Sequence, residues 1–320
     1  NNSDTVQVAT VSITATDNGC SAAPVTFNIT VKPSPVVVLN DITVCQGSTV
    51  PGLMPASNLA GTQFSWTNSQ VAIGLAASGI GQIPSFTAQL PGTAPITSNV
   101  QVSSVASGCQ GLPVNMTITV NPLPQVTQPA NQSLCTGEMT SPVYFTGTQP
   151  AADYQWTNNQ TSIGLMQQGT GDIPSFTTVN FGSSPVSATV TVIPMLAACT
   201  GTPVDFTFTV YPLANLVQPL NQFLCNGEAT APITFFGTTG GTTYSWTNDN
   251  TAIGLAASGS GNIPSFTAVN PSNTTVSANI TVTAMANSCP GVSRTFKIFV
   301  DPTPGMAQPD NITVCSGSVV

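Results

Sequence analysis

Cysteine is the residue with the clearest capacity for covalent chemistry in this sequence. It occurs eight times, in two series with a regular spacing: Cys45, Cys135, Cys225 and Cys315, and Cys20, Cys109, Cys199 and Cys289. Zinc sites and thiol redox centres usually pair cysteine with histidine or place two cysteines as C-x-x-C. The chain has no histidine and no C-x-x-C motif. The spacing therefore favours disulfides formed in an oxidising, extracellular compartment.

Other reactive groups are scarce, because only 4% of the 320 residues are charged and the net charge is -8. Without histidine, Ser-His and Cys-His nucleophile pairs cannot form. Lys32, Arg294 and Lys297 are the only cations, which is too few for a nucleic-acid-binding surface. No acidic position recurs in every repeat, so we expect no calcium site per repeat. We predict no catalytic residue, no cofactor and no metal.

The cysteine spacing is part of a wider internal repeat. Trp66, Trp156 and Trp246 recur every 90 residues, each followed by Thr-Asn and, further on, by Ile-Pro-Ser-Phe. Proline clusters separate the repeats. We therefore expect three full repeats at 34–122, 123–212 and 213–302, the C-terminal part of a repeat at 1–33 and the N-terminal part of a further one at 303–320. On this interpretation the chain is a piece of a longer array.

Within a repeat the apolar residues alternate with polar ones, which is typical of strands with one buried face. In the second repeat this pattern predicts strands near 125–134, 142–148, 153–158, 161–166, 172–179, 185–195 and 203–211. Seven short strands in about 90 residues predict an immunoglobulin-like β-sandwich. The fold class is therefore all-β: a tandem array of immunoglobulin-like, PKD-like domains joined by short proline-containing linkers into an elongated rod.

Two recurrent aromatic positions are best interpreted as core. A tryptophan on the third strand fills the centre of such a sandwich, and the phenylalanine of Ile-Pro-Ser-Phe turns inward from an edge strand. These residues are Trp66, Trp156, Trp246, Phe86, Phe176 and Phe266. Phe64, Tyr154 and Tyr244 lie two residues before the tryptophans, so strand alternation places them on the same inward face. The AIGLAASG segments at 72–79 and 252–259 are expected to form a strand and a turn.

The sandwich topology bears on how the cysteines pair. The first cysteine of a repeat follows strand A and the second precedes strand G, and these turns lie at opposite ends of a module. Because a disulfide needs Cα atoms within about 7 Å, we favour module-to-module pairing, Cys45 with Cys199 and Cys135 with Cys289. The alternative within modules is Cys45 with Cys109, Cys135 with Cys199 and Cys225 with Cys289. Pairing across a linker, such as Cys109 with Cys135, is a further option.

The combined pattern resembles a known family. The strings VCQGSTV and LCTGEMT, the WTN strand, GLAASGSGNIPSFTA and the SCPG turn leading to TFKIFVDP are similar to the PKD-like and immunoglobulin-like tandem repeats of giant Bacteroidota surface proteins. The resemblance covers the whole chain. It implies export by the type IX secretion system and a role in filamentous adhesins, some of which serve gliding motility. PKD domains carry WDFGDG where this chain has WTN, at 66–68, 156–158 and 246–248.

These features predict a structural filament or stalk at the cell surface, with the repeats supplying length and stiffness. Its expected partners are neighbouring repeats, other filaments laterally, and a surface or glycan ligand bound by a tip outside this segment. No nucleic acid and no membrane span are expected. The alternative is a multivalent glycan-binding array, which would need exposed aromatic platforms or clustered polar groups at matching positions. An enzyme has little support, because no acid–base pair recurs.

Overall fold

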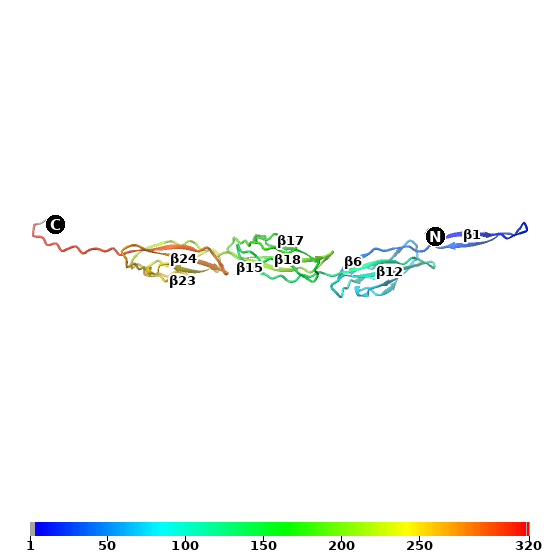
Figure 1. Ribbon diagram of the computed structural model, residues 1–320, viewed down its shortest axis with the longest axis horizontal. Coiled ribbons are helices and arrows are strands. Elements are labelled where there is room, and N and C mark those ends of the chain that lie inside the picture. Colours follow the sequence, from blue (N-terminus) through cyan, green and yellow to red (C-terminus); the bar gives the residue numbers. More distant parts are fainter. Residues whose placement is uncertain (1–3, 318, 320) are drawn as a thin grey trace.

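The protein is a thin rod of three β-modules in line. The computed structural model describes residues 4–317 and 319. Figure 1 shows a β-hairpin at the N-terminal end, three modules in sequence order and an extended segment at the C-terminal end. The prediction of tandem immunoglobulin-like β-sandwiches is confirmed.

Each module contains one large sheet, described here for module two. Its strand order is β15 (Gln132–Cys135), β20 (Val204–Tyr211), β18 (Val186–Leu196), β16 (Asp153–Asn158) and β17 (Gln168–Thr170). A short strand, β19 (Cys199–Thr200), pairs with the end of β18. All of these pairs are antiparallel except β15 with β20, which is parallel. The first and last strands of the module therefore run in the same direction, towards the next module.

Modules one and three repeat this topology. In module one the strands are β6 (Ile42–Cys45), β9 (Gln63–Asn68), β10 (Ser78–Ile80), β12 (Ile96–Ala106), β13 (Cys109–Gln110) and β14 (Val114–Asn121). In module three they are β21 (Gln222–Cys225), β22 (Thr243–Asn248), β23 (Ser258–Ser260), β24 (Val276–Ala286), β25 (Cys289–Pro290) and β26 (Arg294–Asp301).

The opposite layer of each sandwich is much smaller. In module one it contains β7 (Thr49–Val50) paired with β11 (Phe86–Thr87), and β5 (Val37–Val38) paired with β8 (Ala56–Ser57). In module two, single bridges such as Val143 with Ile173 replace such pairs. The predicted strands at 142–148 and 172–179 therefore exist as isolated bridges. Prolines in these segments limit the number of ladder hydrogen bonds.

The core forms between the two layers, as the alternating pattern predicts. β20 buries Phe206, Phe208 and Val210 completely, while its intervening residues are partly exposed. Trp66, Trp156 and Trp246 are 3%, 3% and 6% exposed. Phe86, Phe176 and Phe266 are partly buried and pack against the same clusters. The recurrence of both aromatic positions is thus explained by packing.

The segment after the tryptophan strand differs from the sequence prediction. Residues 161–166 were expected to be a strand, but Thr161–Ile163 form a 3-10 turn that ends at Gly164. Val71–Ile73 and Thr251–Ile253 form the same turn, so the expected strand at the start of 72–79 and 252–259 is also wrong. The short strands β17 and β19 were not predicted. Alternation failed here because Ile163 and Leu165 point inward from a turn.

The N-terminal end has the strand pairing of part of a module. β1 (Gln7–Ile13) and β4 (Val25–Val31) form the N-terminal hairpin, and β2 (Thr16–Asp17) pairs with β3 (Cys20–Ser21) at its tip. The β1–β4 register matches that of β12 with β14. The apolar face that is core in the modules is exposed here, for example at Phe27 and Ile29. Residues 303–317 contain no strand among the described residues.

Candidate functional site: the module junctions

The junctions between modules are covalently linked. Cys45 of module one is bonded to Cys199 of module two, and Cys135 of module two to Cys289 of module three. In both bonds the Cα atoms are 5.6 Å apart and the cysteines are 154 residues apart in sequence. These are the pairs that the strand topology favours. The within-module scheme and the linker-spanning scheme do not occur for these four residues.

The strand directions explain why these cysteines meet. Cys45 and Cys135 end β6 and β15, so each lies at the end of its module from which the chain leaves. Cys199 and Cys289 follow the tight turns after β18 and β24, at the opposite end of the next module. The turn before Cys289 has positive φ at Asn287 and Ser288, which is typical of two-residue hairpin turns. Each bond therefore joins two ends that already face one another.

A glycine two residues after the second cysteine lets the linker pack closely. A Cβ atom at Gly201 would lie 1.8 Å from the Pro124 carbonyl oxygen, and one at Gly291 would lie 1.9 Å from that of Ala214. Because such contacts are far below van der Waals distance, only glycine fits. The Cys-x-Gly pattern was present in the sequence, but its role depends on the linker position. Hairpin, linker and disulfide thus form one packed junction.

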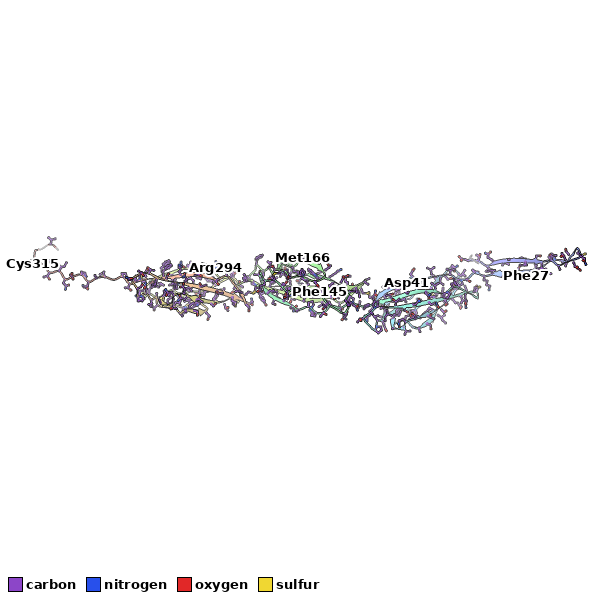
Figure 2. The ribbon with its side chains drawn as sticks, in the orientation of Figure 1. Phe27, Asp41, Phe145, Met166, Arg294 and Cys315 are labelled. Atoms are coloured by element: carbon purple, nitrogen blue, oxygen red, sulfur yellow. A yellow bond between two sulfur atoms is a disulfide. The ribbon has the colours of Figure 1, made fainter. Side chains whose placement is uncertain are left out.

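The other four cysteines form no disulfide among the described residues. Cys20, Cys225 and Cys315 are exposed and Cys109 is partly exposed. Figure 2 shows Cys315 on the extended C-terminal segment. Cys109 has the same pairing position as Cys199, opposite the last residue of the long strand. Each of these thiols therefore occupies one of the two positions that are bonded at the junctions.

One polar contact ties the first strand of every module to its last. Asp41 Oδ1 accepts a hydrogen bond from the Thr117 amide at 2.7 Å, and Asn131 and Asn221 accept equivalent bonds at 2.7 Å from Thr207 and Lys297. Because this bond stabilises the charged carboxylate, it lowers the pKa of Asp41 below its ordinary value of 3.8. The contact fixes the first strand against the last one where their parallel pairing begins.

The asparagine of the WTN motif was not singled out from the sequence. Asn158 is buried; its Nδ2 donates to the Leu165 carbonyl at 3.1 Å and its Oδ1 accepts from the Gln160 amide at 3.0 Å. Asn68 and Asn248 make the corresponding bonds. These contacts hold the 3-10 turn against the strand. The regular recurrence of WTN was the available signal.

The carboxylates are dispersed. Among the described residues, no group of three or more His, Cys, Asp or Glu side chains could hold a metal ion. Asp172 accepts from the Phe145 amide, and Asp249 accepts from Asn279, which lowers the pKa of Asp249. Glu138 Oε2 accepts from the Cys135 amide at 2.7 Å. These side chains stabilise turns and strand ends.

The aromatic residues beside the tryptophans do not form exposed platforms. Phe64 is buried, and Tyr154 and Tyr244 pack against the cores. Burial raises the pKa of both tyrosines, and the Asp172 charge adds to the effect at Tyr154. The inward orientation predicted from alternation therefore holds.

Two shallow grooves lie at matching positions of modules two and three, beside Trp156 and Trp246. Each has a volume of about 400 Å3. Gln155, Thr157, Gln168, Thr170 and the apolar Ile193 line the first, whereas the second is lined by Ser245, Thr247, Ser258, Ser260, Thr281 and Thr283. The polar side chains among them could form hydrogen bonds to a polar ligand such as a glycan.

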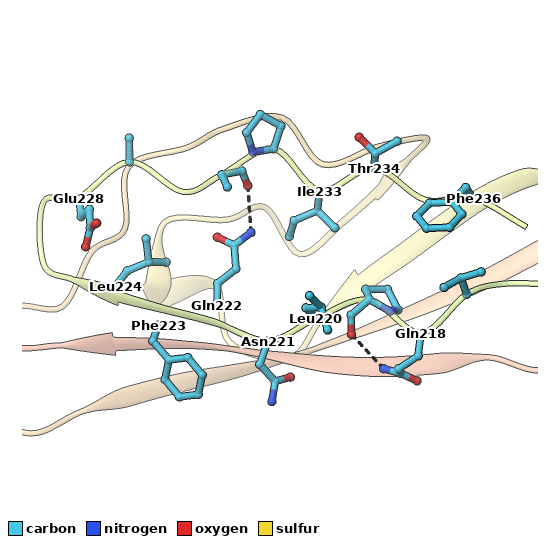
Figure 3. A pocket seen from close by; sticks show the side chains of 15 residues that line it. Gln218, Leu220, Asn221, Gln222, Phe223, Leu224, Glu228, Ile233, Thr234 and Phe236 are labelled. Carbon is cyan, nitrogen blue, oxygen red and sulfur yellow. Dashed lines mark hydrogen bonds between the residues drawn. The ribbon is translucent and has the colours of Figure 1, made fainter.

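Module three has a further, apolar groove of about 790 Å3 between its first strand and the segment 228–236 (Figure 3). Gln222 Nε2 donates to the Ala231 carbonyl at 3.0 Å across it. Phe223 and Phe236 among its lining residues are exposed, and Phe223 stacks on Phe299. Module two has Ser133 and Thr146 at the positions of Phe223 and Phe236.

Comparison with known proteins gives structural neighbours alone. No protein-family model and no curated protein sequence matches the chain. Similar solved structures include the I9–I11 tandem of titin (13% identity, TM-score 0.29, covering 84% of this chain and 100% of that one) and Sidekick-1 immunoglobulin domains 1–4 (13%, 0.34, 93% and 91%). Mouse cadherin-23 EC22–24 is another (12%, 0.35, 84% and 99%). Similarities this low carry no inference about function.

Within the described part of the chain, no helix has the length and apolar character needed to cross a membrane.

Proposed function

We propose that this chain is a structural segment of an extracellular filament, in which the modules supply length and stiffness. The observation that carries the proposal is the pair of disulfides between successive modules. A string of independent domains needs no covalent bond across its junctions, whereas a rod that must keep its shape gains from one. Disulfides are typical of oxidising, extracellular compartments, which supports an extracellular location.

The sequence resemblance extends this proposal to a large bacterial surface adhesin. The filament would be exported by type IX secretion and would serve attachment, with gliding motility as one setting. A tip beyond this segment would hold the surface or glycan ligand. The scarcity of titratable side chains supports a role other than catalysis.

Neighbouring filaments are proposed as lateral partners. The chain has few charged side chains that would prevent its exposed sheet edges from pairing with those of another filament. Light scattering at neutral pH should then show particles larger than single rods as concentration rises. Monodisperse single rods at high concentration would contradict lateral association.

The structural role is tested by exchange. In the native host, residues 34–302 are replaced by an unrelated β-sandwich array of equal length. If the segment acts as a stalk, the foreign array restores attachment to near the native level. Deletion without replacement is the matched control, and it should weaken attachment. Failure of an equally long foreign rod to restore attachment would contradict a purely structural role.

The second candidate is a multivalent glycan-binding array, which the matching polar grooves of modules two and three favour. On this view Thr157 and Thr247 contact the ligand, and affinity rises with the number of modules. Glycan-array screening of the whole chain tests it, with a Thr157→Val, Thr247→Val double variant as control. Binding that is absent, or unchanged in the double variant, would refute it.

A further inference from the structure

We propose that tension along the rod is carried by two disulfide-joined backbone strands, and that most of each module lies outside this load path. The first tension strand consists of residues 20–45, the Cys45–Cys199 bond and residues 199–225. The second consists of residues 109–135, the Cys135–Cys289 bond and residues 289–315. This inference rests on the proposed filament function for its biological setting, but its test does not.

The disulfides shorten the covalent connection along the rod. Each disulfide links residues 154 apart in sequence, so it provides a short covalent route past a long stretch of chain. Between residues 110 and 303 the backbone contains 193 steps. Through the Cys135–Cys289 bond the route needs only 39 steps. A force applied along the rod acts on the shortest covalent route once that route is taut.

This route is already close to fully extended. It follows β13, β14 and β15 to Cys135, and β25 and β26 after Cys289. No helix or turn interrupts residues 109–135 or 289–303. Strands rise about 3.3 Å per residue, and the limit for a stretched chain is about 3.6 Å. Over 39 steps the slack is roughly 10 to 20 Å.

The two tension strands lie side by side. In module two, β15 is part of the second tension strand and β20 is part of the first. The two β-strands pair in parallel, from Gln132 with Phe208 to Cys135 with Tyr211. The Thr136 amide donates to the Tyr211 carbonyl at 2.9 Å, beyond the last paired residues. The two strands can therefore share load through hydrogen bonds that cross the pulling direction.

The remainder of each module is a side loop. Residues 136–198 of module two include β16, β17, β18 and the buried Trp156. This loop joins the tension strands at its two ends, Cys135 and Cys199, and both ends are held in junctions. Load that follows the tension strands does not pull the loop apart. Module two therefore stays folded while the tension strands carry the load.

Single-molecule force spectroscopy tests this on the full 320-residue chain. Handles are attached through azido residues placed at the exposed positions Gln110 and Thr303, and the unpaired thiols are alkylated. With both disulfides intact, the distance between the handles should increase by no more than roughly 20 Å, even at forces that unfold the reduced chain. After reduction, the same molecule should lengthen by about 550 Å as its modules unfold.

Two double variants form a matched pair. Removing the spanning bond, by Cys135→Ser with Cys289→Ser, leaves a shortest route of 169 steps through Cys45–Cys199, so unfolding should release roughly 450 Å. Removing the other bond, by Cys45→Ser with Cys199→Ser, leaves the 39-step route, so extension should stay near the oxidised value. Each double variant lacks one of the two disulfides of the native chain.

Either of two results would overturn the proposal: long unfolding steps in the oxidised native chain, or equal lengthening of the two variants. The oxidised chain could extend by only about 20 Å while the foreign array of the exchange experiment fails to restore attachment. That pair of results would refute the filament function and leave the load path intact. The two conclusions are thus separable.

Discussion

Replacing Gly291 with alanine should loosen the junction between modules two and three. The new Cβ atom would lie 1.9 Å from the Ala214 carbonyl oxygen and 2.9 Å from its carbonyl carbon. Carbon and oxygen atoms in contact are usually about 3.3 Å apart or more, so the hairpin and the linker must separate by more than 1 Å. Both are backbone, and Ala214 is buried in the core of module three, so neither can move freely.

Overpacking of this kind costs about 1 to 3 kcal/mol. In a module of about 90 residues each kcal/mol lowers the melting temperature by roughly 4 to 8 °C. We therefore expect module three of the Gly291→Ala variant to unfold about 5 to 20 °C below its native melting temperature. The Cys135–Cys289 bond should also be reduced faster by dithiothreitol, because Gly291 lies two residues from Cys289.

Hydrogen-exchange mass spectrometry across a urea series measures the free energy of unfolding separately for each module. Peptides from β24 and β26 report on module three, and those from β12 and β14 on module one. Gly240→Ala is the matched control, because Gly240 lies in the same module and a Cβ atom there would meet no atom within 4 Å. A surface change of this kind should alter the free energy of unfolding by less than about 0.5 kcal/mol. Equal stability of the two variants would refute the close-packing argument.

Three further predictions concern contacts inside the modules. The pKa of Asp41 is lower in the folded state, so the stability that its carboxylate contributes is present above the unfolded pKa near 3.8 and disappears as pH falls through the folded pKa. Asp41→Asn introduces the residue type that modules two and three have at this position. Thermal melts from pH 2 to 6 should show that this variant removes the acid-sensitive part of the stability of module one. Asn158→Leu leaves the Gln160 amide and the Leu165 carbonyl unpaired and should cost about 1 to 3 kcal/mol in urea unfolding, whereas an unchanged midpoint would contradict the structural role. Gly169→Ala would place a Cβ 2.2 Å from the Trp156 ring, so the tryptophan emission of module two should shift and its stability fall by about 1 to 3 kcal/mol.

Local pattern predicted three long strands of the main sheet but not its short strands β17 and β19, and of the strand predicted at 125–134 only β15 (Gln132–Cys135) forms. The strand predicted at 153–158 has the bounds of β16, and those predicted at 185–195 and 203–211 differ by one residue from β18 and β20. Each has one buried face, so alternation reports directly on it. The pattern failed at 161–166, because the turn there is held by the buried side chain of Asn158 rather than by its own periodicity.

The sequence by itself determined the 90-residue period, the all-β class and the inward side of the tryptophan strand, because repetition and alternation are local properties of the chain. With an assumed immunoglobulin topology it also favoured module-to-module pairing of the cysteines over pairing within a module or across a linker. Only the tertiary structure decided among the schemes, since the choice depends on which ends of two modules face one another. The parallel pairing of β15 with β20 places Cys135 at the exit of its module, and the turn after β24 places Cys289 at the entrance of the next. Contacts between residues 154 positions apart have no signature in local sequence, because the direction in which whole modules stack creates them.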